Sequence, residues 1–365
     1  MVPVQRNLGV NEFQRQRLRR ASRWKLSVIA LVFFLFATVV FSTNLGFAPI
    51  SFSKVLAVFW KQTPLVGVLP LSSEPSVAEE IIVLQVRLPR VVGGALVGAA
   101  LAAAGVVFQG IFRNPMADPY VIGSSAGAAL GAASAIVLGV GYTAFGVSSV
   151  SALAFIGALA SVLVVYNIAR VGSRVPVTTL LLAGITVSIF LSAIVGMITV
   201  VAGERLHALI FWLMGGLSYM EWGDVTSMAP LLAVGIAVIS LYARDLNMLL
   251  LGEETAKHLG ADVEKFKLLL LIFATLITAA AVSVSGLIGF VGLIIPHLMR
   301  MLVGPDHRIL IPASLIMGAT FLMLCDALAR VVFLPGELPV GIITALGGGP
   351  FFIYLLRKKR ETYAF

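Results

Sequence analysis

The sequence has few charged residues and almost no cysteine. Asp, Glu, Lys and Arg make up 12% of the 365 residues, whereas soluble domains carry about 25%. The single cysteine, Cys325, lies within an apolar run, which excludes a disulfide framework and a cysteine metal site. The histidines are scattered and form no spaced ligand set; they are His207, His258, His297 and His307. We therefore expect no resident metal.

The sequence also lacks the phosphate-binding loop of an ATPase. None of the eight lysines follows a glycine, so the motif G-x-x-x-x-G-K-[S/T] does not occur in the sequence. The stretch LGGGP at 346–350 has no lysine. We expect a chain that is not an enzyme and holds no cofactor, so that any energy from ATP must come from another polypeptide.

What the sequence does have is a series of apolar runs of about 20 residues, the length that crosses a bilayer as a helix. Hydrophobic residues make up 59% of the chain. Alternating ten-residue segments, which are typical of a membrane barrel, are absent. The sequence predicts an all-α polytopic membrane protein with a short extra helix near 203–222. The ten predicted spans are 26–46, 91–112, 119–139, 149–169, 177–201, 226–243, 267–285, 286–303, 309–329 and 338–356.

Basic residues predict the orientation of these spans. With the N-terminus inside, 20 of the 26 lysines and arginines lie in cytoplasmic segments and six outside. We expect a basic cytoplasmic tail at 1–25, a transmembrane domain at 26–357 and a cytoplasmic tail at 358–365, in the cytoplasmic (inner) membrane. Attraction of this basic face to anionic lipid explains the net charge of +9 without a nucleic acid partner.

One hydrophilic segment, residues 244–266, separates two apolar spans on the predicted cytoplasmic side. Glu253 and Glu254 suit the start of a short helix, and Lys257 and His258 suit its end. Gly260 is a typical residue after a helix C-cap, and Asp262 is a typical N-cap for the next helix. Thr255, Ala256 and Leu259 give this helix a small apolar stripe. A simple connector would be shorter, so we interpret the segment as a docking site for a cytoplasmic partner.

Asp326 is a carboxylate inside a predicted span, where a charge without a partner is costly. Arg330 follows it at i+4, so the two are expected to pair. A proton relay through Asp326 is the alternative; it is disfavoured because we expect no second buried carboxylate nearby in the sequence.

Several motifs together resemble the FecCD-type permeases of iron-siderophore, haem and cobalamin importers. The helix segment 252–260 resembles their coupling helix, and the resemblance extends over about 85–357. The other stretches are RLPRVVGGALVGAALAAAG (87–105), NPMADPYVIGSSAGA (114–128), TTLLLAG (178–184), FWLMGG (211–216), GFVGLIIPHLMR (289–300), DHRILIPAS (306–314) and ELPVGIITALGGGPFFIYLL (337–356). Residues 50–86 fit poorly, and we assign them no function.

The resemblance implies a fold, partners and residue roles. It implies the type II fold of ATP-binding-cassette (ABC) importer permeases, working as a homodimer with two copies of a separate ATPase, which binds ATP and Mg, and an extracytoplasmic substrate-binding protein. It places docking of that protein at Arg87, Arg90 and Arg330. It places a cytoplasmic gate at Asn114, Met116, Val177 and Thr178, and coupling to the ATPase at Gly252, Glu253, Glu254, Ala256, Leu259 and Gly260.

The expected function is import of a large metal chelate, with ferric siderophore preferred over cobalamin and haem. One alternative is an ion-coupled secondary transporter, which would need acidic residues near the membrane midplane; only Asp326 comes close. A membrane scaffold or receptor without transport is the second alternative.

Overall fold

The chain is almost entirely helical in a computed structural model. The structure describes residues 4–46, 48, 50–62, 74–141, 143–144, 147–172, 174–260, 262–333 and 335–363. Among these residues the only strands are β1 (Thr143–Ala144) and β2 (Val147–Ser148), which pair antiparallel. The predicted all-α fold is confirmed.

Seven helical segments in the described residues are long and apolar enough to cross a membrane. They belong to α1 (Val4–Asn44), α3 (Val77–Ile81) continued through the π-helical η1 (Ile82–Arg87) into α4 (Leu88–Ile111), α6 (Ser149–Ala169), α7 (Val177–Val200), α9 (Trp222–Leu241), α12 (Val263–Ser285) and α14 (His307–Val331). Shorter apolar helices are α5 (Ser124–Leu138), α13 (Val291–Val303) and the first part of α15 (Val340–Tyr363). Each predicted span corresponds to one of these helices.

The boundaries of two spans differ from the predictions. The helices α5 and α13 begin at Ser124 and Val291, five residues later than the predicted spans. The preceding segments, 112–123 and 286–290, are irregular but lie against each other, and the Tyr120 hydroxyl donates to the Ile288 carbonyl at 3.0 Å. Irregular backbone inside a membrane bundle is tolerated where protein covers it. The expected tail boundaries at 25 and 358 fall within α1 and α15.

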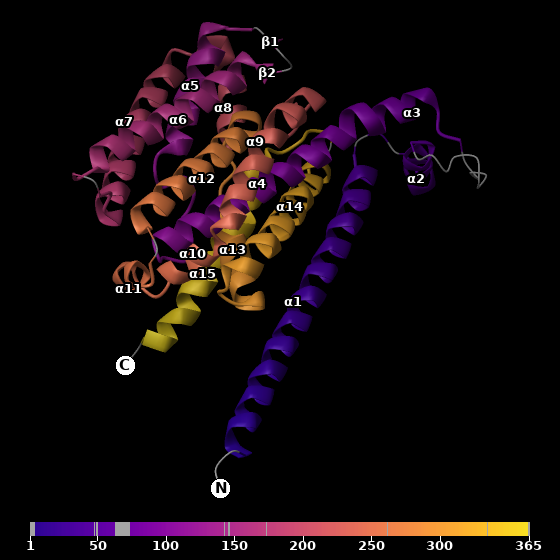
Figure 1. The fold of residues 1–365 in the computed structure, drawn as a ribbon. Helices are drawn as coiled ribbons and strands as arrows, with labels where there is room; N and C mark the ends of the chain where they lie inside the picture. The colour runs from indigo at the N-terminus through magenta and orange to yellow at the C-terminus, as the bar shows by residue number, and fades with distance from the viewer. Residues whose placement is uncertain are drawn as a thin grey trace.

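The helices run back and forth between two ends of the bundle (Figure 1). The start of α1, the last residues of α15 and α11 (Glu253–His258) lie at one end, which we call the α11 end. The β1–β2 pair and α3 lie at the other end, the hairpin end. The remaining short helices are α2 (Phe52–Lys61), η2 (Gly203–Arg205), α8 (Leu206–Met214) and α10 (Ala243–Leu249).

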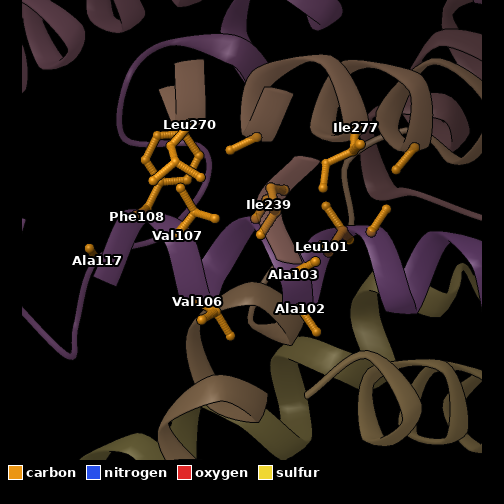
Figure 2. Close-up of a cluster of buried hydrophobic side chains, with 14 of the residues drawn as sticks. Leu101, Ala102, Ala103, Val106, Val107, Phe108, Ala117, Ile239, Leu270 and Ile277 are labelled. Carbon is orange, nitrogen blue, oxygen red and sulfur yellow. The ribbon is translucent and has the colours of Figure 1, made fainter. Parts of the chain in front are cut away.

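The helix α4 passes through the centre of the bundle. Figure 2 shows Leu101 and Phe108 of α4 facing Ile277 and Leu270 of α12, while Ala102 points to the other side. On that side α4 packs closely on α14, since a Cβ on Gly98 would overlap the carbonyl group of Gly318. Small residues thus bring the two backbones together, as is common where helices pack in membranes.

At the hairpin end, residues 50–62 and 74–86 form a small substructure for which the sequence predicted no role. Ser76 and Glu79 form a capping box at the start of α3. Lys54 of α2 pairs with Glu79 at 2.7 Å, and Lys61 pairs with Glu80. These contacts attach α2 to the beginning of the long α3–η1–α4 stretch.

Candidate functional site

A buried cluster of charges lies where α4 and α14 meet at the hairpin end. Asp326 of α14 is at its centre: its Oδ1 accepts from Arg90 Nε at 3.0 Å and from Arg90 Nη2 at 2.9 Å. Arg330 Nε lies 3.2 Å from Asp326 Oδ2. The structure therefore contains the pair expected from the i, i+4 spacing and adds a two-point contact from Arg90, a geometry that suits arginine and carboxylate.

Glu337 extends this cluster toward solvent. Its Oε2 accepts from Arg90 Nη1 at 2.8 Å and from the Ser218 hydroxyl at 2.9 Å. Partial burial opposes ionisation of Glu337, but the charge and hydrogen bond of Arg90 outweigh that effect and hold the pKa of this carboxyl below its ordinary value. Glu337 is thus a carboxylate that holds Arg90 at the edge of the bundle.

Two arginines of the cluster also bind the end of α1. Arg87 Nη1 donates to the carbonyls of Thr43 and Asn44 at 3.1 and 3.0 Å, and Arg330 Nη1 donates to that of Leu45 at 2.8 Å. The last carbonyls of a helix have no partner within it, and its C-terminus favours cations. Arg87, the last residue of η1, and Arg330 therefore attach the end of α1 to the η1–α4 stretch and to α14.

These contacts bear on the docking role expected for the three arginines. Arg87, Arg90 and Arg330 are only 5%, 8% and 3% exposed. Their guanidinium groups are bound within the chain, although the buried Arg330 Nη2 has no hydrogen-bond partner among the described residues. A carboxylate that arrives at Arg90 would have to replace an internal partner. Sequence spacing could indicate the Asp326–Arg330 pair, but it gave no signal for Arg90, which is 236 positions from Asp326, or for Glu337, which lies in the connection after α14.

At the α11 end, the predicted short helix is present as α11. Gly252 before it and Gly260 after it have φ of 108° and 88°, where glycine is favoured. The Asp262 side chain accepts from the Lys265 amide at 3.2 Å and caps α12 as predicted. The hydrophilic segment thus folds into ordered helices.

The two faces of α11 differ in exposure. Ala256, expected on the outer stripe, is 0% exposed and packs into the bundle. Glu253 points toward α12 and pairs with Lys267 at 2.9 Å. Leu259, at 59% exposed, remains outside together with Leu251 at 64%, and Glu254 is also exposed. The side chains available to a partner therefore include Leu251, Glu254, Thr255, His258 and Leu259.

The residues expected at the gate come from two segments at the α11 end. Asn114 and Met116 lie in the turn after α4, where the Asn114 side chain accepts from the Met116 amide at 3.0 Å. Val177 and Thr178 open α7. A pocket of about 310 Å³ lies between Val177, Ile111 of α4 and Leu271 of α12, and its described lining includes neither Asn114 nor Met116.

Comparison with known proteins places this architecture in a family. The sequence model of the FecCD transport family matches residues 32–358. The chain belongs to the FecCD transport family. The cluster around Asp326 and the α10–α11 segment both lie within the matched residues.

Relatives of this FecCD chain include three named permeases. It is 47% identical over 300 residues to the cobalamin import system permease protein of Halobacterium salinarum, covering 82% of this chain and 80% of that protein. It is 41% identical to the hemin transport system permease protein of Yersinia pestis, covering 76% and 84%. It is 34% identical to the Fe(3+) dicitrate transport system permease protein of Escherichia coli, covering 84% and 95%.

A solved structure shares the fold of the FecCD chain. It is described as an inward-facing conformation of a putative metal-chelate type ABC transporter, and it matches with a TM-score of 0.78 and 31% identity over 91% of this chain and 98% of that one. The chain is therefore an integral membrane protein with the fold of an ABC transporter permease.

Proposed function

We propose that the chain is the transmembrane permease subunit of an ABC importer that carries a large metal chelate across the cytoplasmic membrane. The observation that carries this proposal is the match of residues 32–358 to a transport family. Three relatives are named for cobalamin, hemin and ferric dicitrate, which are all bulky metal chelates. The shared class supports a chelate as cargo, with ferric siderophore, cobalamin and haem as the candidates.

In this proposal the α11 end faces the cytoplasm. The N-terminal tail and the C-terminal helix, both rich in lysine and arginine, lie at that end, together with the 244–266 segment, which contains Arg244, Lys257 and Lys265. An excess of basic residues on the cytoplasmic side is the rule for membrane proteins. The hairpin end then faces outward, toward the substrate-binding protein.

The partner that binds the α11 end is a separate ATPase, present in two copies beneath a permease homodimer. Leu251 and Leu259 offer exposed apolar side chains beside Glu254, and an apolar centre with a polar rim is typical of a protein interface. Glu253 and Ala256 hold α11 on the bundle. In this assignment Gly252 and Gly260 set the position of α11, and motion of the ATPase reaches the gate at Asn114, Met116, Val177 and Thr178.

Docking of the substrate-binding protein is assigned to the hairpin end, at Arg87, Arg90 and Arg330. Because Arg90 is bound to Glu337 and Asp326, we propose that a carboxylate of the binding protein replaces Glu337 as the outer partner of Arg90. Glu337→Gln would remove the competing charge and is expected to tighten docking a few-fold. Arg90→Glu is expected to weaken it, with the larger effect at low salt. Both are measured by binding-protein titration of the purified complex, and unchanged affinity in both variants contradicts the assignment.

The proposal is tested by transport in proteoliposomes that contain the permease, its ATPase and its binding protein. Radiolabelled cyanocobalamin, haemin and ferric citrate are offered in parallel, and uptake of one of them is expected only with ATP and an active ATPase. Uptake that persists with an inactivated ATPase favours the ion-coupled alternative. A complex that shows neither uptake nor substrate-stimulated ATP hydrolysis favours a scaffold.

A further inference from the structure

A polar joint at the α11 end connects three elements that are far apart in sequence. The helix α10 precedes α11 and packs against both α4 and α14. Its Asn247 side chain reaches the first turn of α14: Asn247 Nδ2 donates to Asp306 Oδ1 at 2.9 Å, and Asn247 Oδ1 accepts from the His307 amide at 2.8 Å. Asn247 therefore caps a helix to which it does not belong.

The ring of His307 completes the joint. His307 Nδ1 lies 2.8 Å from Asn247 Oδ1, and because an amide oxygen can only accept, Nδ1 carries the proton and donates. The side chain is fully buried. Its Nε2 has no hydrogen-bond partner among the described residues and points at Gly110 of α4, where an added Cβ would lie 3.1 Å away.

Gly110 brings α4 into the same contact. A Cβ at this position would also lie 3.0 Å from Leu246 Cδ2 of α10, and Leu246 is fully buried. A side chain at this position would therefore press on both Leu246 and His307, and glycine lets α10, α14 and the end of α4 approach without that crowding. The joint consists of Asn247, His307, Asp306, Leu246 and Gly110.

The connection from this joint to α11 is short. Leu250, Leu251 and Gly252 separate α10 from α11, and the amides of Leu251 and Gly252 donate to Met248 and Leu249 of α10 at 3.0 Å each. A turn closed in this way leaves little freedom between the two helices, so a displacement of α11 must move α10 with it.

We infer that Asn247 and His307 are positioning residues that transmit movement of α11 to α4 and α14. The inference rests on the proposed function, because it presupposes that an ATPase moves α11. In the ATPase-bound importer, α10, α14 and the end of α4 move as one unit. Without the Asn247 hydrogen bonds, α10 follows the ATPase while α4 and α14 lag behind.

The test compares Asn247→Ala with wild type in proteoliposomes that contain the ATPase and the binding protein. The readout is the number of substrate molecules carried per ATP hydrolysed, with the chelate that wild type transports as the probe. We expect this ratio to fall about fivefold or more, which is the lower end of coupling between sites. Assembly and basal ATP hydrolysis should stay within about twofold of wild type. The matched control is Asn167→Ala, since the exposed Asn167 side chain donates only within its own helix, to Leu163.

Variants of His307 separate hydrogen bonding from packing. His307→Asn keeps an N–H donor close to the position of Nδ1 and should retain most of the coupling ratio, whereas His307→Leu should lose it. If the Asn247→Ala ratio equals that of Asn167→Ala, or if the two His307 variants behave alike, the inference is wrong while the proposed function stands. A wild-type complex without ATP-dependent uptake contradicts both.

Discussion

Single residues in this protein hold helices together through buried charges. Asp326 is 2% exposed and has two arginine partners from two helices. Removing one member of a buried ion pair leaves the other without compensation, which typically costs about 3–5 kcal/mol. The stability of the junction between α1, α4 and α14 should therefore depend on this one carboxylate.

Asp326→Ala is expected to destabilise the folded permease by about 3–5 kcal/mol, because it leaves Arg90 and Arg330 buried without their shared carboxylate. The measurement is thermal unfolding in detergent, followed by tryptophan fluorescence. Glu337→Gln is the control, since Glu337 is partly exposed and binds Arg90 only from the edge; it should cost much less. Equal losses of stability in Asp326→Ala and Glu337→Gln would show that the cluster does not depend on Asp326 more than on Glu337.

The hydrogen bonds of Asp306 predict how the stability of the fold depends on pH. The hydrogen bonds from Arg308, and then from Asn247, lower the pKa of this carboxyl below its ordinary value, which is about 4 in an unfolded chain. A carboxyl with a depressed pKa stabilises the fold fully above the unfolded pKa and loses that contribution as pH falls toward the folded pKa. The stability difference between wild type and Asp306→Asn should thus be constant from about pH 8 to 5 and shrink below about pH 4. A stability difference that already shrinks between pH 8 and 5 would contradict the stabilising role of the Asp306 carboxylate.

At the scale of elements, α11 carries the prediction that bears most directly on the partner. Leu259→Glu places a charge on the exposed face of α11 and should abolish co-purification with the ATPase while the chain still inserts into the membrane. Val171→Glu, at an exposed position in the α6–α7 connection, is the control for an added charge at another site on the surface. Normal assembly and transport by Leu259→Glu would contradict the docking role of α11.

The helices were the part of the fold most open to prediction from sequence. Apolar runs indicated each span. Glu253 and Glu254 indicated the start of α11, Gly260 its end, and Asp262 the start of α12, because those signals are local. The delayed starts of α5 and α13 were missed because 119–123 (PYVIG) and 286–290 (GLIGF) carry no charged side chain and therefore extend the apolar runs that follow them. Their contact with each other depends on tertiary packing and has no local pattern. The helical tail at 4–25 was missed because its charges were interpreted only for topology.

The same limit applies to the candidate site. The Asp326–Arg330 pair and the α11 segment could be recognised from residues close in sequence. Arg90 bound to Asp326, and Asn247 bound to His307, depend on the packing of distant helices and have no local pattern. The burial of Ala256 was also missed, because a six-residue helix does not indicate which of its faces meets the bundle.

For the whole molecule, the proposal requires two copies of this chain. Helix α7 has a long exposed apolar face that includes Leu182, Ile189 and Phe190. In detergent, the permease should have the mass of two chains after the bound detergent is subtracted, as measured by light scattering during size exclusion. A single-chain mass under conditions in which uptake activity survives would contradict the homodimer.

The continuous stretch from α3 through η1 to α4 has a mechanical consequence. Its 35 residues make a rod of about 50 Å, longer than the hydrocarbon core of about 30 Å. The rod carries Arg90 near one membrane surface and Gly110 near the other. In the proposed importer, a tilt imposed by the binding protein at one membrane surface would therefore displace the other end of the same stretch, at the side that faces the ATPase.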